Sequence, residues 1–75
     1  MNYPVIDVAA TGTRIKELRK QRALTVRDVQ TALGFDAPQA VYKWERGLSL
    51  PSTDNLLALS LLLDVPIEHI LVYHK

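Results

Sequence analysis

The 75-residue sequence contains no cysteine, which excludes disulfides and thiolate metal sites. Its three glycines are scattered, so it has no glycine-rich phosphate-binding loop. The longest apolar stretch, residues 56–63, is interrupted by Ser60 and is far too short to span a membrane. A chain of this length without a covalent or metal staple must be stabilised by helix packing or by a partner subunit.

Signals for targeting, metal binding and catalysis are also missing. The N-terminus reads MNYPVIDVAATG, without the basic segment and long apolar core of a signal peptide, so we expect a soluble, cytoplasmic protein. His69 and His74 lie five residues apart, on different faces of a helix, so we expect surface or hydrogen-bonded histidines, with no metal site and no cofactor. The serines have no histidine base in plausible reach, and we therefore predict that the protein is not an enzyme.

The charge is unevenly distributed, although the net charge of the chain is only +1. Residues 14–46 carry eight Lys and Arg against four Asp and Glu, a net charge of +4. Residues 1–13 carry −1, and the leucine-rich residues 47–75 carry −2. This division predicts one surface for a polyanion and another for packing.

Apolar residues recur at helical spacing between the glycines and prolines, and no segment shows sustained strand alternation. The fold class predicted is therefore all-α, with five helices. The first spans about residues 8–21 and starts at Asp7 or Thr11. The second starts at Thr25, with Asp28 completing a capping box, and stops at Gly34.

Three further helices follow. The third covers residues 37–47 and starts at Asp36 or Ala37, because a proline at position 38 fits only the first turn. The fourth has Ser52 as its N-cap and ends at residues 64–65. A short fifth helix opens at Pro66 and turns Ile67, Ile70 and Leu71 inward.

The third helix has two different faces. Ala37, Val41 and Trp44 fall on the inward side of a helical wheel. The opposite side holds hydrogen-bond donors that suit base edges and phosphates, without the acids that a solvated face usually mixes in: Gln39, Tyr42, Lys43 and Arg46. An ordinary solvated surface is the competing interpretation.

The second and third helices are joined by a tight turn that contains a glycine, as in a helix-turn-helix. In that arrangement the second helix of the pair lies in the major groove while the first crosses the backbone. The start of the 25–33 helix, with the Thr25 hydroxyl, is then placed to meet a phosphate. Asp28 in the same turn favours a structural capping role for both residues.

A resemblance to a known family rests on two segments, TGTRIKELRKQRALTVRDVQTALGF and YKWERGLSLPSTDNLLALS. The second is similar to the KWE-x-G-x-x-x-P-x-x-x-N-L-x-x-L signature of the Xre/phage-repressor (Cro–cI type) helix-turn-helix family. The resemblance covers residues 11–72. It implies a compact five-helix, lambda-repressor-like DNA-binding domain over residues 11–75, with residues 1–10 as an N-terminal arm or the start of the first helix.

The resemblance also assigns roles to residues. Gln39 and Lys43 match base-contacting positions, and Ala37 and Pro38 stand at the beginning of the recognition helix, where family members also reach bases. Arg46 and the loop 48–50 match a segment that approaches phosphates. Arg19 and Glu45 match a partly buried ion pair between the first and third helices.

Three more side chains complete the predicted site. We expect Thr25, Arg27 and Tyr42 to contact phosphates together with Arg46. For Tyr42, a packing role without a phosphate contact is the alternative. Trp44 lies on the inward face of its helix, and we expect it in the core, tying the third helix to the fourth.

The sequence departs from the family pattern at three positions. Pro38 replaces a polar residue, so we expect an apolar contact there, such as one with a thymine methyl. Val26 stands where many members have a phosphate-binding Gln. Gln30 replaces a small Ala, so either the helix crossing is altered or the Gln30 side chain points toward the backbone.

The fourth helix has too many leucines for one apolar stripe. One face packs on the DNA-binding half, and the other meets either the fifth helix or a second subunit. The sequence as a whole predicts a bacterial or phage transcriptional regulator that binds duplex DNA, a repressor acting as a homodimer. An antitoxin-like protein-interaction module with secondary DNA binding is the alternative, with a protein partner gripped by the leucine-rich half.

Overall fold

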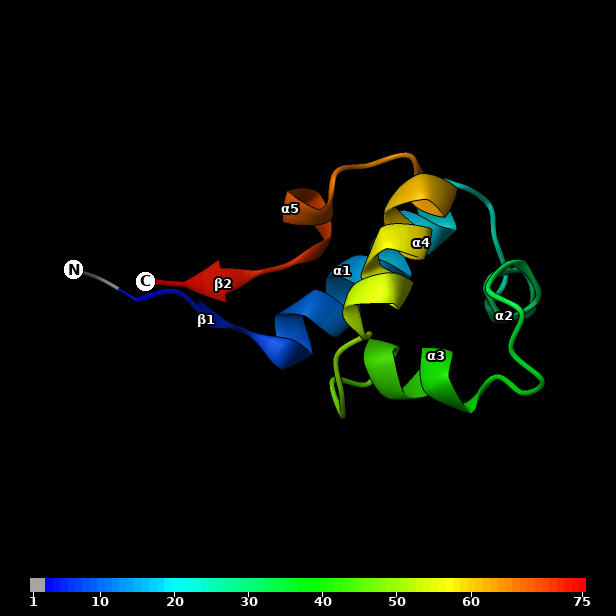
Figure 1. Cartoon of the computed structure of the whole chain (residues 1–75), viewed down its shortest axis with the longest axis horizontal. Helices are drawn as coiled ribbons and strands as arrows, with labels where there is room; N and C mark the ends of the chain where they lie inside the picture. Colours follow the sequence, from blue (N-terminus) through cyan, green and yellow to red (C-terminus); the bar gives the residue numbers. More distant parts are fainter. Residues whose placement is uncertain (1–2) are drawn as a thin grey trace.

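The computed structural model describes residues 3–75, and it contains five helices, as predicted (Figure 1). The elements in chain order are β1 Val5–Ile6, α1 Val8–Gln21, α2 Val26–Ala32, α3 Gln39–Glu45, α4 Thr53–Leu63, α5 Ile67–Ile70 and β2 Tyr73–His74. The all-α fold class is confirmed, with one addition at the chain ends. No helix in this part of the chain is long and apolar enough to cross a membrane.

The addition is a two-stranded antiparallel sheet formed by β1 and β2, here called the terminal ribbon. Val5 is opposite His74, and Ile6 is opposite Tyr73. The ribbon projects from the helices at the end of the molecule opposite α2 (Figure 1). Strands of two residues are too short to produce a visible alternation, which explains why the sequence pattern did not predict them.

Three of the helices, α1, α2 and α4, begin where the capping residues predict. The carboxylate of Asp7, not Thr11, caps α1 by accepting from the backbone N–H of Ala10 at 2.9 Å. Thr25 and Asp28 form the predicted capping box of α2, with hydrogen bonds of 2.8 and 3.0 Å. Ser52 caps α4. These signals are local in sequence, and this makes them readable without the tertiary fold.

The predicted start of the third helix is wrong. Pro38 is the N-cap of α3, and no side chain caps the helix. Ala37 lies outside the helix and is exposed, so the prediction that it turns inward is also wrong. The pyrrolidine ring of Pro38 disfavours helical backbone at the residue before it, so the helix starts only after the proline.

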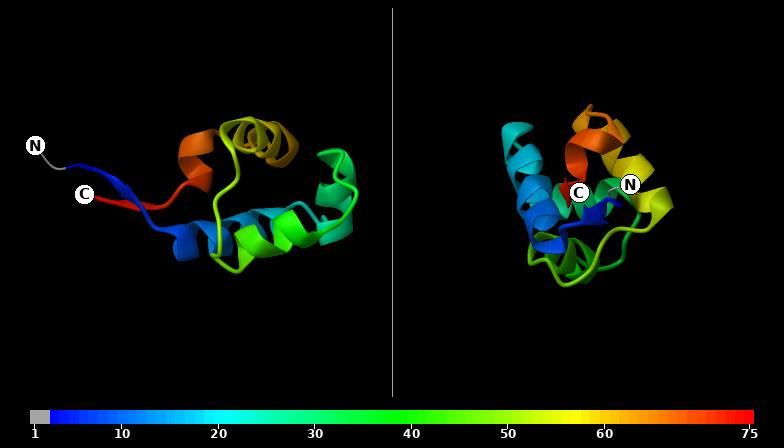
Figure 2. Two further views of the ribbon diagram at one scale, coloured as in Figure 1. Left: turned by 60° about the horizontal axis from the view of Figure 1, so that its bottom comes forward. Right: turned by 90° about the vertical axis from the view of Figure 1, so that its left-hand side faces the viewer.

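The core is drawn from all five helices. It consists of Ile15, Val29, Val41, Trp44, Leu59, Leu63 and Ile70. Trp44 is buried, as predicted, and its ring packs edge-on against Phe35 at a centroid distance of 5.8 Å. Viewed along the long axis, α1 lies on one side of the core, and α4 with α5 lies on the other (Figure 2).

The leucines of α4 divide between the core and solvent. Leu59 and Leu63 are buried, but Leu57 and Leu61 are 53% and 75% exposed. Ile70 of α5 is in the core, yet α5 leaves this second face of α4 uncovered. We considered the fifth helix and a second subunit as the cover of this face. The exposure of Leu57 and Leu61 shows that the fifth helix does not cover them.

Candidate nucleic-acid interface

The position of α3 depends on a close approach to α1, here called the α1–α3 seam and formed by Gly12, Arg19, Glu45 and Gly47. A Cβ atom on Gly12 would overlap the carbonyl oxygen of Trp44. Gly47 has a φ of +72°, and a Cβ there would lie 2.7 Å from the Cα of Ala9. Position 47 requires both a positive φ and the absence of a Cβ atom, and only glycine meets both requirements. Gly12 and Gly47 therefore set how closely α3 packs on α1.

The seam also contains the ion pair expected from the family resemblance. Arg19 donates from Nε and Nη2 to the two carboxylate oxygens of Glu45, at 2.7 and 3.0 Å. Its remaining nitrogen, Nη1, donates to the carbonyl of Leu24 at 2.9 Å. Both side chains are at most 10% exposed, and the hydrogen bond to Glu45 raises the pKa of Arg19. The bidentate pair therefore fixes α3 against α1 and against the turn before α2.

Gln30 ties the turn between α2 and α3. Its amide Nε2 donates to the carbonyl of Phe35 at 3.3 Å. Of the two possibilities considered for the larger side chain at this position, the structure confirms the one in which Gln30 points toward the backbone. The Phe35 ring also packs on Trp44. The turn is therefore fixed by a hydrogen bond to the Phe35 carbonyl and by the packing of the Phe35 ring.

The two faces of α3 are separated as predicted. Val41 and Trp44 are buried, whereas Gln39, Tyr42, Lys43 and Arg46 are all exposed. The Arg46 guanidinium lies 5.6 Å from the centre of the Tyr42 ring, a cation–π contact that restrains both side chains. The exposed face of α3 thus presents an amide, a phenol and two cations from a helix whose other side is anchored.

The remaining predicted site residues lie around this face. Ala37 is exposed and Pro38 half-buried at the start of α3, and Arg27 is exposed in the first turn of α2. Thr25 is exposed, but its backbone N–H donates to Asp28 and its hydroxyl accepts from the Asp28 N–H. These bonds lower the pKa of the Asp28 carboxyl. Only the hydroxyl proton of Thr25 remains to be donated to a phosphate.

Three of the eight basic residues in the segment 14–46 have structural partners. Besides Arg19, Arg14 donates to the carbonyl of His69 at 2.8 Å, and Arg22 donates to the carbonyl of Leu63 at 3.0 Å. Sequence reasoning counted all eight toward a polyanion surface and missed these roles, since the partners lie 55 and 41 residues away. The other five are Lys16, Lys20, Arg27, Lys43 and Arg46, and of these Arg27, Lys43 and Arg46 belong to the predicted site.

The histidines are not part of this face. His74 in the terminal ribbon has its Nε2 at 2.8 Å from a carboxylate oxygen of Asp7, in agreement with the prediction of a hydrogen-bonded histidine. His69 is exposed. Within residues 3–75, no group of three His, Asp or Glu side chains is arranged to hold a metal ion.

A short helix with a polar outer face, anchored on α1 and joined to α2 by a tied turn, is how helix-turn-helix proteins present a helix to the major groove. The fold and site define the class: a helix-turn-helix domain of the DNA-binding transcriptional regulators. The sequence model of the helix-turn-helix family matches residues 15–70. The chain belongs to this family, the Xre/Cro–cI type that its motifs resemble.

Solved structures agree. The chain is 30% identical to the restriction-modification controller protein C.AhdI from Aeromonas hydrophila, with a TM-score of 0.76, covering 85% of this chain and 96% of that one. It is 30% identical to SinR, the master regulator for biofilm formation, solved in complex with DNA, with a TM-score of 0.72 and coverage of 80% and 95%.

A more distant structure shares the fold alone. The DNA-binding domain of BldD from S. venezulae is 21% identical, with a TM-score of 0.73 and coverage of 88% of this chain and 97% of that one. No curated protein sequence matches the chain significantly.

Proposed function

We propose that this protein is a sequence-specific repressor of transcription that reads the major groove of duplex DNA with α3. The observation that carries the proposal is the exposed face of α3, which presents an amide, a phenol and two cations and no acid, while the opposite face is buried in the core. The likeness to SinR, which was solved bound to DNA, and to the controller protein C.AhdI supports it. The protein would act in the cytoplasm of a bacterium, on bacterial or phage operators.

Base recognition is assigned to two side chains of α3 and to the two residues that precede the helix. Gln39 suits the N6 and N7 positions of adenine, and Lys43 suits O6 and N7 of guanine. Both lie on the exposed face, about one helical turn apart. Ala37 and Pro38 precede them and offer apolar surface, which suits a thymine methyl.

Phosphate contacts are assigned to four side chains that surround the reading face. Tyr42 lies in the middle of α3 and Arg46 directly follows the helix, whereas Thr25 and Arg27 lie at the start of α2. Such contacts set the register of the protein on the duplex and carry no sequence information. Arg46, placed by its contact with Tyr42, is expected to contribute most.

The repressor is proposed to bind as a homodimer. One domain of this size covers only a few base pairs, whereas two copies related by a two-fold axis read two half-sites about 34 Å apart. A palindromic operator is the expected consequence.

The test is in-vitro selection from random duplexes, followed by salt titration on the enriched site. We expect Lys43→Ala to relax base preference, whereas Arg46→Ala should weaken binding to all sequences about equally and reduce the log–log salt slope by about 1. Lys16→Ala, an exposed cation outside the assigned contacts, is the control. Equal losses on all sequences for both α3 variants would contradict the assigned roles, and no enrichment would contradict the function.

A second function has one observation in its favour. Leu57 and Leu61 are exposed one turn apart on α4, which suits an antitoxin-like module that grips a protein partner and binds DNA secondarily. In that case Leu57→Ser/Leu61→Ser should abolish co-purification of the partner and leave DNA binding unchanged. A toxin-like gene next to this one would favour the same function.

A further inference from the structure

The terminal ribbon has two unlike faces. Side chains alternate across a strand, and residues directly opposite each other share a face. Because Ile6 is opposite Tyr73, these two lie on one face, and Pro4 and Lys75, two positions away along each strand, lie on the same face. This face is turned toward α5.

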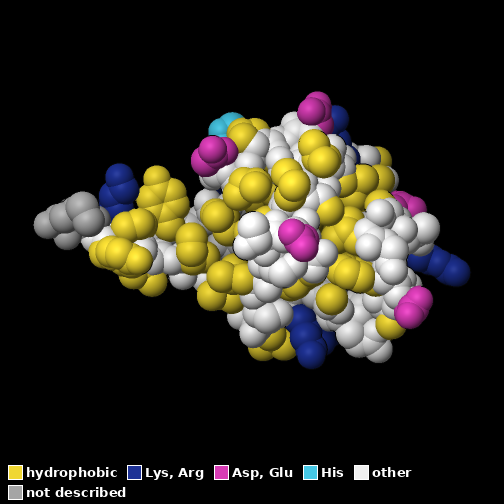
Figure 3. Space-filling view, in the orientation of Figure 1, with side chains coloured by type: hydrophobic (Ala, Val, Ile, Leu, Met, Phe, Trp, Pro, Cys, Tyr) yellow, Lys and Arg dark blue, Asp and Glu magenta, His cyan; other side chains and the backbone are white. Residues whose placement is uncertain are grey.

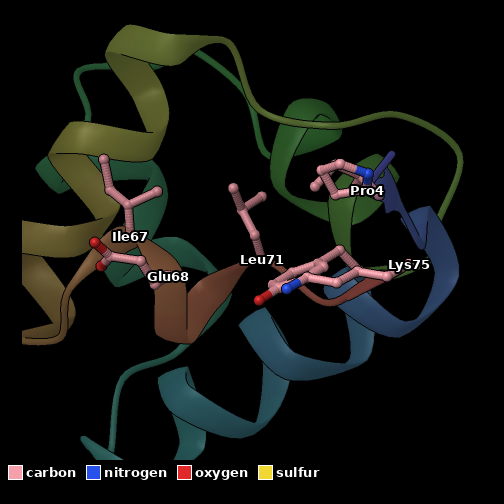
Figure 4. A pocket seen from close by; sticks show the side chains of 7 residues that line it. Pro4, Ile67, Glu68, Leu71 and Lys75 are labelled. Atoms are coloured by element: carbon pink, nitrogen blue, oxygen red, sulfur yellow. The ribbon is translucent and has the colours of Figure 1, made fainter. Parts of the chain in front are cut away.

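A groove of about 550 Å³ lies between that face and α5 (Figure 4). Ile67, Glu68 and Leu71 form its second side. Leu71 lies between the α5 side chains and Pro4 in the close-up view (Figure 4). The lining is apolar except for Glu68, Lys75 and the hydroxyl group of Tyr73, so the groove suits a protein surface rather than a polyanion.

The ribbon is incomplete by itself. A two-stranded sheet is marginally stable in water unless something packs on it or extends it. Tyr73 is 48% exposed on the groove face, and Val5 is 63% exposed on the opposite face. Within residues 3–75, β1 and β2 pair only with each other. Hydrophobic side chains continue from the ribbon over the neighbouring helices on the face shown in Figure 3.

The charges at the groove are self-complementary. Glu68 comes from α5 and Lys75 from the chain end beyond β2, and both are exposed. Neither takes part in the ion pairs that the structure shows for residues 3–75. A two-fold interface places the same patch of each copy against the other, so that a patch with one acid and one base satisfies itself.

We propose that a second copy of this chain docks in this groove, with α5 of each copy covering the terminal ribbon of the other and Glu68 of each copy paired with Lys75 of the other. The inference rests on the proposed homodimer and names its surface. None of the lining residues belongs to α2 or α3, so the reading face stays open in this dimer.

The test is sedimentation velocity of the full chain without DNA, on two charge reversals and their mixture. Glu68→Lys gives a chain whose groove carries two bases, and Lys75→Glu gives one with two acids. Each variant alone repels itself twice across the two-fold axis, so its dimer dissociation constant should rise by more than about tenfold over the wild type. An equimolar mixture should dimerise again like the wild type, because each base then faces an acid.

Lys16→Glu, a matched reversal on α1 outside the groove, should leave the dimer unchanged. Positions 68 and 75 are exposed, so at a protein concentration low enough for all chains to be monomeric the melting temperatures of the variants should match the wild type. A monomeric wild-type chain, single variants that dimerise normally, or a mixture that stays monomeric would each overturn the proposal. Binding to a single half-site, measured separately, reports on α3 alone, so loss of the dimer and loss of DNA binding are distinguishable.

Discussion

The α1–α3 seam and the terminal ribbon differ in which side chains they bury and which they leave exposed. In the seam, charged side chains are buried, and Arg19 and Glu45 satisfy each other in a bidentate pair. In the ribbon, apolar side chains such as Tyr73 are left half exposed, and Asp7 and His74 pair at the surface. The seam is thus complete within one chain, whereas the ribbon leaves surface for a partner.

This difference shows that the domain is most rigid where α3 is held. A recognition helix must be held in place to read bases, and close backbone contact with a buried ion pair permits little adjustment. A ribbon of two residues per strand is held by few bonds. Its fixed points are at its base, where the Asp7 N–H donates to Val72 and Thr11 bonds the same residue.

The largest expected effect is at the seam. Arg19→Met leaves the Glu45 carboxylate buried without its partner, so the free energy of unfolding should fall by about 3–5 kcal/mol in urea denaturation. The double variant Arg19→Met/Glu45→Leu removes both charges and should recover most of that loss. If the double variant is as unstable as the single one, the carboxylate is not the cause.

The next effect concerns backbone approach. Gly12→Ala places a methyl against the carbonyl of Trp44, so we expect a loss of about 3 kcal/mol and weaker DNA binding, because α3 must shift. Gly34→Ala is the control: its φ is +74°, but nothing lies within 4 Å of the added carbon. It should cost about 1 kcal/mol and leave DNA affinity of the folded protein unchanged. Equal effects on DNA binding would argue against the seam as the determinant of α3 placement.

A smaller effect is expected at the base of the ribbon. Thr11 is fully buried, and its hydroxyl accepts from the Val72 N–H at 3.0 Å. Thr11→Val preserves shape but leaves that N–H without an acceptor, so stability should fall by about 1–2 kcal/mol. Amide exchange at residues 72–74 should accelerate while exchange in α3 does not. Thr11→Ser keeps the hydroxyl and should protect the Val72 amide; exposure of α3 amides in Thr11→Val would show that the two regions are not independent.

The smallest effect is a pH dependence at the ribbon. The Ala10 N–H and then His74 hold the pKa of Asp7 below its ordinary value of 3.8. Its stabilising contribution is therefore present above pH 3.8 and is lost as the pH falls through the lower folded pKa. The melting temperature should drop below about pH 4, and Asp7→Asn should flatten part of that drop. Asp28→Asn should flatten another part, since the pKa of Asp28 is also lowered; an unchanged profile in both variants would contradict the two assignments.

Much of the fold could be predicted because its signals are local. Asp7, Thr25 and Ser52 each bond a backbone N–H three residues away, so the starts of α1, α2 and α4 could be read from short windows. The division of α3 into a buried and an exposed face follows from its periodicity. The Arg19–Glu45 pair spans 26 residues, and only the family resemblance supplied it.

Other features depend on residues far apart in the sequence. The start of α3 was placed too early, because the effect of Pro38 on Ala37 prevailed over the helical pattern. The sequence does not reveal the role of Gly12, because the atom that Gly12 contacts, the carbonyl oxygen of Trp44, belongs to another helix. The assigned DNA contacts remain predictions, for which the exposure of α3 provides the geometry.

The sequence by itself determined five helices, the caps of α2 and α4 and the polar face of α3, because hydrogen bonds and periodicity within one helix need no distant partner. Tertiary structure decided which cations stay free, since Arg14 and Arg22 are taken by carbonyls of α5 and α4. It also decided that the two chain ends meet as a ribbon beside α5. Such contacts join positions tens of residues apart, and only the packed chain brings them together.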